Sequence, residues 1–195
     1  MFSSASTMPC KIVRVCKHSE TVNITYRYAK ERENERYALG KTLCTDCSKR
    51  LEQMFKEPGD VVFDIILPPL RGSDKQVAWA GKIRAERWKL FGSVLQRVSL
   101  GDPEDVLILP MYRALLAYAA MDSAKYWIDG RDFKSNHWGL KSDTEFFLKA
   151  PAYGTMVGEF SPYGRLKQFN QPLLNRIMQA TLPENVAPVA EQQAS

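Results

Sequence analysis

The sequence predicts an α+β protein in which a small N-terminal module precedes a larger, mainly α-helical domain. All four cysteines fall within the first 47 of 195 residues, strand-like alternation covers residues 22–28, and helical periodicity begins at Ser73. Hydrophobic residues at 45% and charged residues at 25% are typical of a globular chain. This composition excludes collagen-like and wholly disordered proteins.

The cysteines predict a zinc site in the N-terminal module. Cys44-Thr45-Asp46-Cys47 has the spacing of a metal-binding pair, and zinc sites need a second pair some distance away. We predict Cys16, His18, Cys44 and Cys47 as ligands, with Cys10 as the alternative to His18. A disulfide framework needs an oxidising compartment, and the N-terminus lacks the features of a secretory signal. A redox Cys-x-x-Cys pair or four unrelated thiols would also account for these cysteines.

The residues around the cysteines predict a hairpin between the two ligand pairs. A strand, a charged connector, a second strand and a helix are expected in turn, at residues 22–28, 30–35, 36–43 and 48–55. This order over residues 10–56 resembles a treble-clef or zinc-ribbon module, a zinc finger-like unit. It departs from that pattern in having Cys16-x-His18 where Cys-x-x-Cys is usual. Four protein ligands leave no open position, so the zinc is expected to be structural.

Turn-forming residues suggest where the domains meet. Pro58-Gly59-Asp60 ends the module, which gives a zinc-binding module at residues 1–57 and a mainly helical domain at residues 61–182. The apolar residues 61–67 are expected to form a strand or an extended linker, because the prolines that follow disfavour a continuous helix. Residues 183–195 are polar and aperiodic, and are expected to be a disordered tail.

The first helix of the second domain is expected to start after Ser73, which forms a capping box with Gln76. Lysines recur every seven residues on its polar face, at Lys75, Lys82 and Lys89, and Trp79 lies at the edge of that face. The residues expected to be buried lie on the opposite face: Val77, Ala80, Ile83, Phe91 and Leu95.

Two arginines interrupt the apolar face of this helix. Arg84 and Arg87 are expected to reach the surface or to pair with an acidic residue such as Asp122. The alternative is that they meet a phosphate or an acidic partner.

Further helices are expected downstream. A helical block opens at Asp102-Pro103, is interrupted at Pro110 and continues over residues 111–121. Residues 124–128 are expected to extend it or to start a short new helix, with Gly130 as the stop. Residues 172–180 are expected to form a last short helix. Between them, residues 131–170 alternate glycines, aromatics and bases, and are expected to be an irregular segment folded over the helices. The same composition suits single-stranded nucleic acid.

The charge is unevenly distributed. The net charge is +5 and the isoelectric point about 9.0. Residues 71–100 carry seven basic and two acidic side chains, a net of +5. A basic patch attracts nucleic acid, anionic lipid or an acidic protein face, although a solvated surface without such a partner has the same composition.

Two strings resemble segments of small uncharacterised proteins carried by phages, plasmids and integrative elements. They are GSDKQVAWAGKIR at residues 72–84 and AKYWIDGR at residues 124–131, and the similarity spans residues 10–131. In those proteins the first string often follows a cysteine-pair module. The resemblance implies an accessory protein of a mobile genetic element in a bacterial cytoplasm, and it implies no reaction.

Catalytic motifs are missing from the sequence, so no enzyme is predicted. It contains no phosphate-binding glycine loop, nucleophile elbow or His-Glu-x-x-His. We expect nucleic-acid binding without strong sequence preference, through Lys75, Trp79, Lys82 and Lys89. The alternative is a protein-interaction factor that binds a host complex of defence or replication. A metal-dependent nuclease is a third possibility. No apolar run approaches the roughly 18 residues of a membrane span, so no membrane partner is expected.

Overall fold

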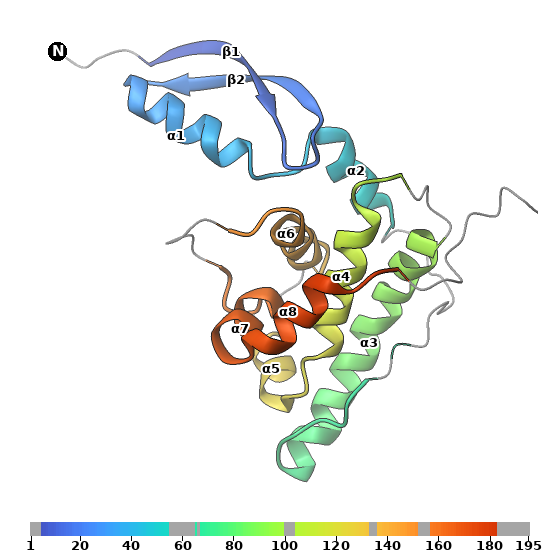
Figure 1. Ribbon diagram of the computed structural model, residues 1–195. Helices are drawn as coiled ribbons and strands as arrows, with labels where there is room; N and C mark the ends of the chain where they lie inside the picture. Colours follow the sequence, from blue (N-terminus) through green and yellow to red (C-terminus); the bar gives the residue numbers. More distant parts are fainter. Residues whose placement is uncertain are drawn as a thin grey trace, which may run out of the picture. The chain divides into compact units, whose positions relative to one another are not determined.

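The computed structural model describes residues 5–54, 65, 67–99, 104–132, 136–151 and 157–182 (Figure 1). The chain divides into two compact units, Met1–Arg50 and Leu51–Ser195. A two-stranded antiparallel sheet lies at the N-terminus, and a mostly helical region follows. This arrangement confirms the predicted α+β class.

The N-terminal unit is built on a β-hairpin. Strand β1 (Ser6–Val13) pairs antiparallel with β2 (Ser19–Tyr26), and Cys10 lies opposite Val22. Helix α1 (Ala29–Leu39) packs on this sheet, and α2 (Thr45–Met54) follows. One face of the hairpin forms a small apolar core with members from both strands and from α1: Met8, Cys10, Ile12, Val22, Ile24, Tyr26 and Leu39.

The predicted position of the hairpin was wrong. The strand expected at residues 22–28 exists as β2, but its partner precedes it in the chain. The expected connector and second strand, residues 30–43, instead contain helix α1. Its residues are mainly Ala, Glu, Lys and Arg, which are strong helix formers. The Glu31 carboxylate also accepts hydrogen bonds from the backbone N–H groups of Arg27 (2.7 Å) and Tyr28 (3.3 Å), which fixes the start of the helix.

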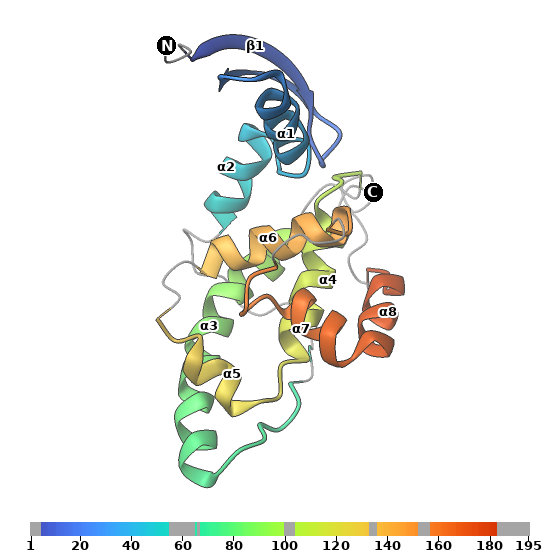
Figure 2. The same cartoon turned by 90° about the vertical axis from the view of Figure 1, so that its left-hand side faces the viewer.

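The second unit is organised around helix α4. It contacts α3, α6, α7 and α8, and α5 lies along α3 (Figure 2). The buried side chains of α4 form one broad face, and those on the other side, Leu109, Tyr112, Arg113 and Leu116, are partly buried. The helices of this unit are α3 (Asp74–Ser99), α4 (Ile108–Ala119), α5 (Ala124–Asp129), α6 (Asn136–Leu148), α7 (Pro162–Phe169) and α8 (Gln171–Gln179).

The capping box of α3 is present. The Ser73 backbone N–H donates to Gln76 Oε1 at 3.0 Å, and the Gln76 N–H donates to Ser73 Oγ at 3.4 Å. The predicted faces of the helix are also confirmed in large part. The buried side chains are Ala80, Phe91 and Leu95, the partly buried ones are Val77 and Ile83, and the exposed ones are Lys75, Lys82 and Lys89.

The two arginines on the apolar side of α3 bind backbone carbonyls. Arg84 donates to the carbonyl of Pro68 at 2.7 Å, and the buried Arg87 donates to that of Gly130 at 2.9 Å. The expected pairing with Asp122 was wrong, because Asp122 forms its ion pair with Arg71. The hydrogen bonds compensate the guanidinium groups for lost water.

The segment predicted to be irregular, residues 131–170, contains helices α6 and α7. A buried polar contact between them explains their packing, since Asp143 on α6 accepts a hydrogen bond from the Ser161 hydroxyl at the start of α7. Pro110 lies in the first turn of α4 and does not interrupt it, because the first turn needs no N–H at that position. Gly130 ends α5 as predicted.

Three predicted features concern residues outside the described part of the chain. These are the apolar segment at residues 61–64 and 66, the pair Asp102-Pro103 at the predicted helix start and the tail at residues 183–195. The described residues that follow, 104–107, are not helical, so the helix begins later than predicted, at Ile108.

Candidate metal centre

The first ligand pair lies in the turn between β1 and β2. The Arg14 N–H donates to the carbonyl of His18 at 2.8 Å, and the Lys17 N–H donates to that of Arg14 at 2.9 Å. Lys17 has a φ of 65°, in the left-handed region that residues other than glycine rarely adopt. This tight turn presents Cys16 and His18 from one short loop.

The second ligand pair lies at the start of α2. Cys44 immediately precedes the helix, and its carbonyl accepts the hydrogen bond of the Ser48 N–H at 2.9 Å. Cys47 lies in the first turn. The partial positive charge of a helix N-terminus favours the thiolate form of cysteines placed there, and thiolates are the form that binds metal.

The two pairs converge. One potential ligand atom from each of Cys16, His18, Cys44 and Cys47 lies within 4.8 Å of all the others, and the three cysteines are buried. His18 Nδ1 is 3.5 Å from Cys44 Sγ and 3.3 Å from Cys47 Sγ. Zn–S and Zn–N bonds of about 2.3 and 2.0 Å give ligand separations of roughly 3.5–3.8 Å in a tetrahedron. The group could therefore hold a metal ion.

Cys10 is not part of this group. It lies within the core of the hairpin, on the face that carries Ile12 and Ile24. The structure therefore brings His18, and not Cys10, together with the other three residues that the sequence indicated.

Backbone amides and neighbouring thiols give Cys44 and Cys47 different pKa values. The Cys44 N–H donates to Cys16 Sγ at 3.4 Å, and the Cys47 N–H donates to Cys44 Sγ at 3.4 Å. Burial opposes ionisation of Cys44, but hydrogen bonds from Cys47, His18 and Cys16 outweigh it and lower its pKa. Burial, together with Cys44 and Cys16, raises the pKa of Cys47. Ionisation of all three thiols at this distance would therefore need a cation among them.

Two residues that the sequence analysis missed hold the ligand loops together. Arg14 is ion-paired with Glu20 and donates to the carbonyl of Leu39 (2.9 Å) and to Thr42 Oγ1 (2.6 Å). Glu20 in turn accepts from the backbone N–H of Thr45. The sequence did offer one signal for this ion pair, since Arg14 and Glu20 flank the first ligand pair. The predicted hairpin was wrongly placed and did not bring these two residues together.

The candidate nucleic-acid residues lie on the exposed face of α3. Trp79 is 49% exposed, and the guanidinium of Arg131 lies over its ring at 5.4 Å. Lys75, Lys82 and Lys89 are exposed along the same helix. We refer to Lys75, Trp79, Lys82 and Lys89 as the α3 basic face.

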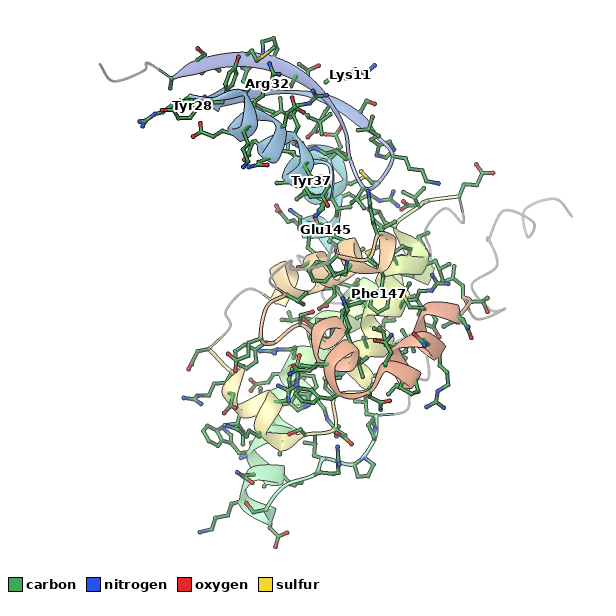
Figure 3. All side chains as sticks on the ribbon, turned by 60° about the vertical axis from the view of Figure 1, so that its left-hand side comes forward. Lys11, Tyr28, Arg32, Tyr37, Glu145 and Phe147 are labelled. Carbon is green, nitrogen blue, oxygen red and sulfur yellow. The ribbon has the colours of Figure 1, made fainter. Side chains whose placement is uncertain are left out.

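The N-terminal unit carries its own exposed aromatic and basic side chains. Tyr28 and Tyr37 are 63% and 60% exposed, and the Lys41 ammonium lies 3.8 Å from the centre of the Tyr37 ring. Figure 3 shows both tyrosines together with Lys11 on β1 and Arg32 on α1.

Comparison with protein-family models, curated proteins and solved structures finds no match to this chain. In the part of the chain that the structure describes, no helix combines the length and apolarity needed to cross a membrane.

Proposed function

We propose that Cys16, His18, Cys44 and Cys47 bind a structural zinc ion. Three thiolates and one imidazole are a donor set that zinc prefers, and four protein ligands complete its tetrahedral coordination. The start of α2 at the second ligand pair supports a relationship to the treble-clef and zinc-ribbon class. The first pair lies within a hairpin turn, which is a departure from that class.

We propose further that the protein binds nucleic acid without strong sequence preference. The observation that carries this proposal is the α3 basic face, where three exposed lysines recur every seven residues beside an exposed tryptophan. Lysines at this spacing line one side of a helix and can meet phosphates along a strand, and an indole ring can stack on an unpaired base. Arg131, over the Trp79 ring, adds a further cation.

The zinc-binding unit is proposed to offer a separate, additional contact for nucleic acid. Its Tyr28 and Tyr37 are exposed, and the Lys41 ammonium lies over the Tyr37 ring. Lys11 on β1 and Arg32 on α1, which is paired with Glu33, are further cations of this unit (Figure 3). Aromatic and basic side chains in combination suit single strands, because rings stack on bases while cations meet phosphates.

The proposed cellular setting is that of an accessory protein of a mobile genetic element in a bacterial cytoplasm. The resemblance of residues 72–84 and 124–131 to proteins of such elements supports it. The competing function is that of an interaction factor for a host complex of defence or replication.

Fluorescence anisotropy with labelled single-stranded DNA, duplex DNA and RNA tests nucleic-acid binding. Replacing Lys75, Lys82 and Lys89 by glutamine should flatten the slope of log affinity against log salt by up to about three units. A control variant with Lys125, Lys149 and Lys167 replaced by glutamine makes the same change in net charge at other exposed positions.

The control should keep the parental slope. Absence of binding by the parent at low salt would refute the proposal, as would equal binding by the two triple variants. A pull-down from lysate, with and without nuclease, tests the competing function. A host protein that remains bound after nuclease treatment favours the interaction factor.

A further inference from the structure

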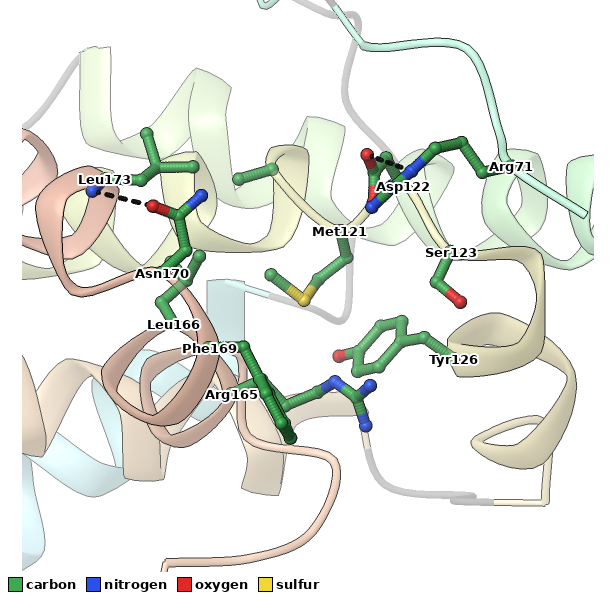
Figure 4. Close-up of a pocket in the computed structure, with 11 residues that line it drawn as sticks. Arg71, Met121, Asp122, Ser123, Tyr126, Arg165, Leu166, Phe169, Asn170 and Leu173 are labelled. Carbon is green, nitrogen blue, oxygen red and sulfur yellow. Dashed lines mark hydrogen bonds and ion pairs between the residues drawn. The ribbon is translucent and has the colours of Figure 1, made fainter.

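A hollow of about 430 Å³ opens between the α4–α5 turn and helices α7 and α8 (Figure 4). Its volume is within the range of small-molecule sites. Its walls combine apolar side chains with a few polar ones, among them Met121, Tyr126, Phe169, Arg165 and Ser123. It belongs to the second unit alone and includes no residue of the metal centre or of the α3 basic face.

Arg165 is the cation of this pocket. Its guanidinium lies 5.5 Å from the centre of the Tyr126 ring and 5.7 Å from that of Phe169, so that two aromatic rings hold it in place (Figure 4). Among the described residues, no carboxylate forms an ion pair with Arg165. A guanidinium held by rings keeps its N–H groups available for an anion.

The second arginine of the pocket is neutralised. Arg71 donates to Asp122 through two nitrogens, at 2.8 and 2.7 Å. The described lining residues therefore carry one net positive charge, and it resides on Arg165. The pocket is suited to one anionic group at that end.

Phe169 provides a flat apolar surface beside the cation. It follows Arg165 by four residues on α7, so both side chains lie on the same side of the helix. Phe169 is 69% exposed and therefore open to a ligand. A planar group bound there would cover this ring.

We propose that the pocket binds one nucleotide, with the phosphate on Arg165 and the base against the ring of Phe169. Arginine pairs with phosphate through two parallel N–H groups, and aromatic rings stack on any base. Two sources share this chemistry, a free nucleoside monophosphate and the 5′-phosphorylated end of a strand. The choice of a nucleotide as ligand rests on the proposed nucleic-acid function.

Calorimetric titration of the full-length protein with thymidine 5′-monophosphate tests the proposal. Arg165→Gln should weaken binding by roughly tenfold or more, as expected for a lost charged hydrogen bond. Phe169→Leu should weaken it by about fivefold or more. Lys167→Gln, an exposed change on the same helix, should bind as the parent does. Thymidine and inorganic phosphate should each bind more weakly than the nucleotide.

Glu159 provides an opposite test. Glu159, Arg165 and Phe169 all line a second hollow. Within the described residues, Glu159 forms no ion pair with Arg165. Its negative charge should repel the phosphate, so Glu159→Gln should strengthen nucleotide binding modestly. Far-ultraviolet circular dichroism of each variant checks that it folds as the parent does.

Two results would overturn the proposal: no binding of the nucleotide by the folded parent at millimolar concentration, or equal binding by Arg165→Gln. Comparison of an oligonucleotide with and without a 5′-phosphate identifies the source, since only a strand-end site gains affinity from the phosphate. The variant lacking Lys75, Lys82 and Lys89 should still bind the mononucleotide. Mononucleotide binding by this variant therefore tests the pocket proposal separately from the proposal that the α3 basic face binds nucleic acid.

Discussion

Glu20 accepts a hydrogen bond from the backbone N–H of Thr45 at 3.0 Å, and this contact joins the two halves of the candidate metal centre. Glu20 follows the turn that carries Cys16 and His18, whereas Thr45 is the first residue of the helix that carries Cys47. The carboxylate satisfies a helix-terminal N–H and is placed at the positive end of the helix dipole. This contact therefore ties the two ligand pairs directly to each other.

Glu20→Ala should destabilise the N-terminal unit by about 1–3 kcal/mol, because the Thr45 amide and the buried Arg14 both lose their acceptor. The Thr45 amide, and then Arg14, lower the pKa of Glu20. Its contribution is therefore present above its unfolded pKa of about 4.3 and is lost as pH falls through the folded value. Urea unfolding of the parent and the variant at pH 7 measures the loss. Glu20→Gln, which keeps an acceptor oxygen for the Thr45 amide, should lose less stability than Glu20→Ala. An unchanged midpoint for Glu20→Ala would contradict this role.

Metal removal should unfold the N-terminal unit, because four ligands from two loops close it around one ion. The purified protein should carry close to one zinc per chain, and Cys47→Ser should abolish this content. Cys10→Ala is the matched control, since Cys10 is buried in the hairpin core and should affect stability but not stoichiometry. Elemental analysis and the thiolate-to-cobalt absorption of the Co²⁺ form provide the readouts. Loss of the metal in Cys10→Ala would refute the assignment of His18 as the fourth ligand.

Lys17→Gly should stabilise the zinc-bound protein by up to about 1 kcal/mol. The φ of 65° at Lys17 costs a residue with a Cβ more than it costs glycine. Part of this gain is offset by the greater backbone entropy of glycine in the unfolded chain. Lys11→Gly, on strand β1, is the control and should destabilise. Thermal unfolding of both variants tests the prediction, and a lower midpoint for Lys17→Gly would contradict it.

The sequence predicted elements well where local signals and tertiary packing agree. Helix α3 has both a capping box at Ser73 and an apolar face, and the structure contains both. The ligand spacing likewise indicated Cys44 and Cys47, because a metal pair is a local pattern. The hairpin was misplaced because the alternation of apolar and polar residues in β2 is compatible with a partner strand before or after it in the sequence. The choice of β1 as partner depends on pairing between strands, which the alternation does not reveal.

Non-local contacts also explain what the sequence did not reveal. Arg14 and Glu20 are ordinary surface residue types, and their roles depend on Thr42 and Thr45 more than twenty positions away. The helical content of residues 131–170 was missed because aromatic and basic residues, glycines and prolines are interspersed there without an evident helical period. Packing against α4 provides the stabilisation that local propensity lacks.

Asp143 is the described carboxylate with the least access to solvent. It is fully buried on α6, where its Oδ1 accepts from the Ser161 hydroxyl at 2.5 Å and from the Tyr163 backbone N–H at 3.2 Å. Burial raises the pKa of Asp143 to about 7, against the smaller lowering effect of these two hydrogen bonds. The folded protein therefore retains a proton at this site that the unfolded chain releases near pH 4.

Asp143→Asn should remove a pH dependence from the stability of the helical unit. Because folding raises the pKa of this carboxyl, the parent should lose stability as pH rises from about 4 to about 7, by up to roughly 4 kcal/mol, and then level off. Asparagine keeps an oxygen acceptor for Ser161 and Tyr163 but does not ionise. Urea unfolding from pH 4 to pH 8 should therefore show little difference at pH 4 and a more stable variant at pH 8. Asp129→Asn, at an exposed ion pair with Lys125, should keep the parental profile. A variant less stable than the parent at pH 8 would show that the buried carboxylate is stabilising there and would refute the prediction.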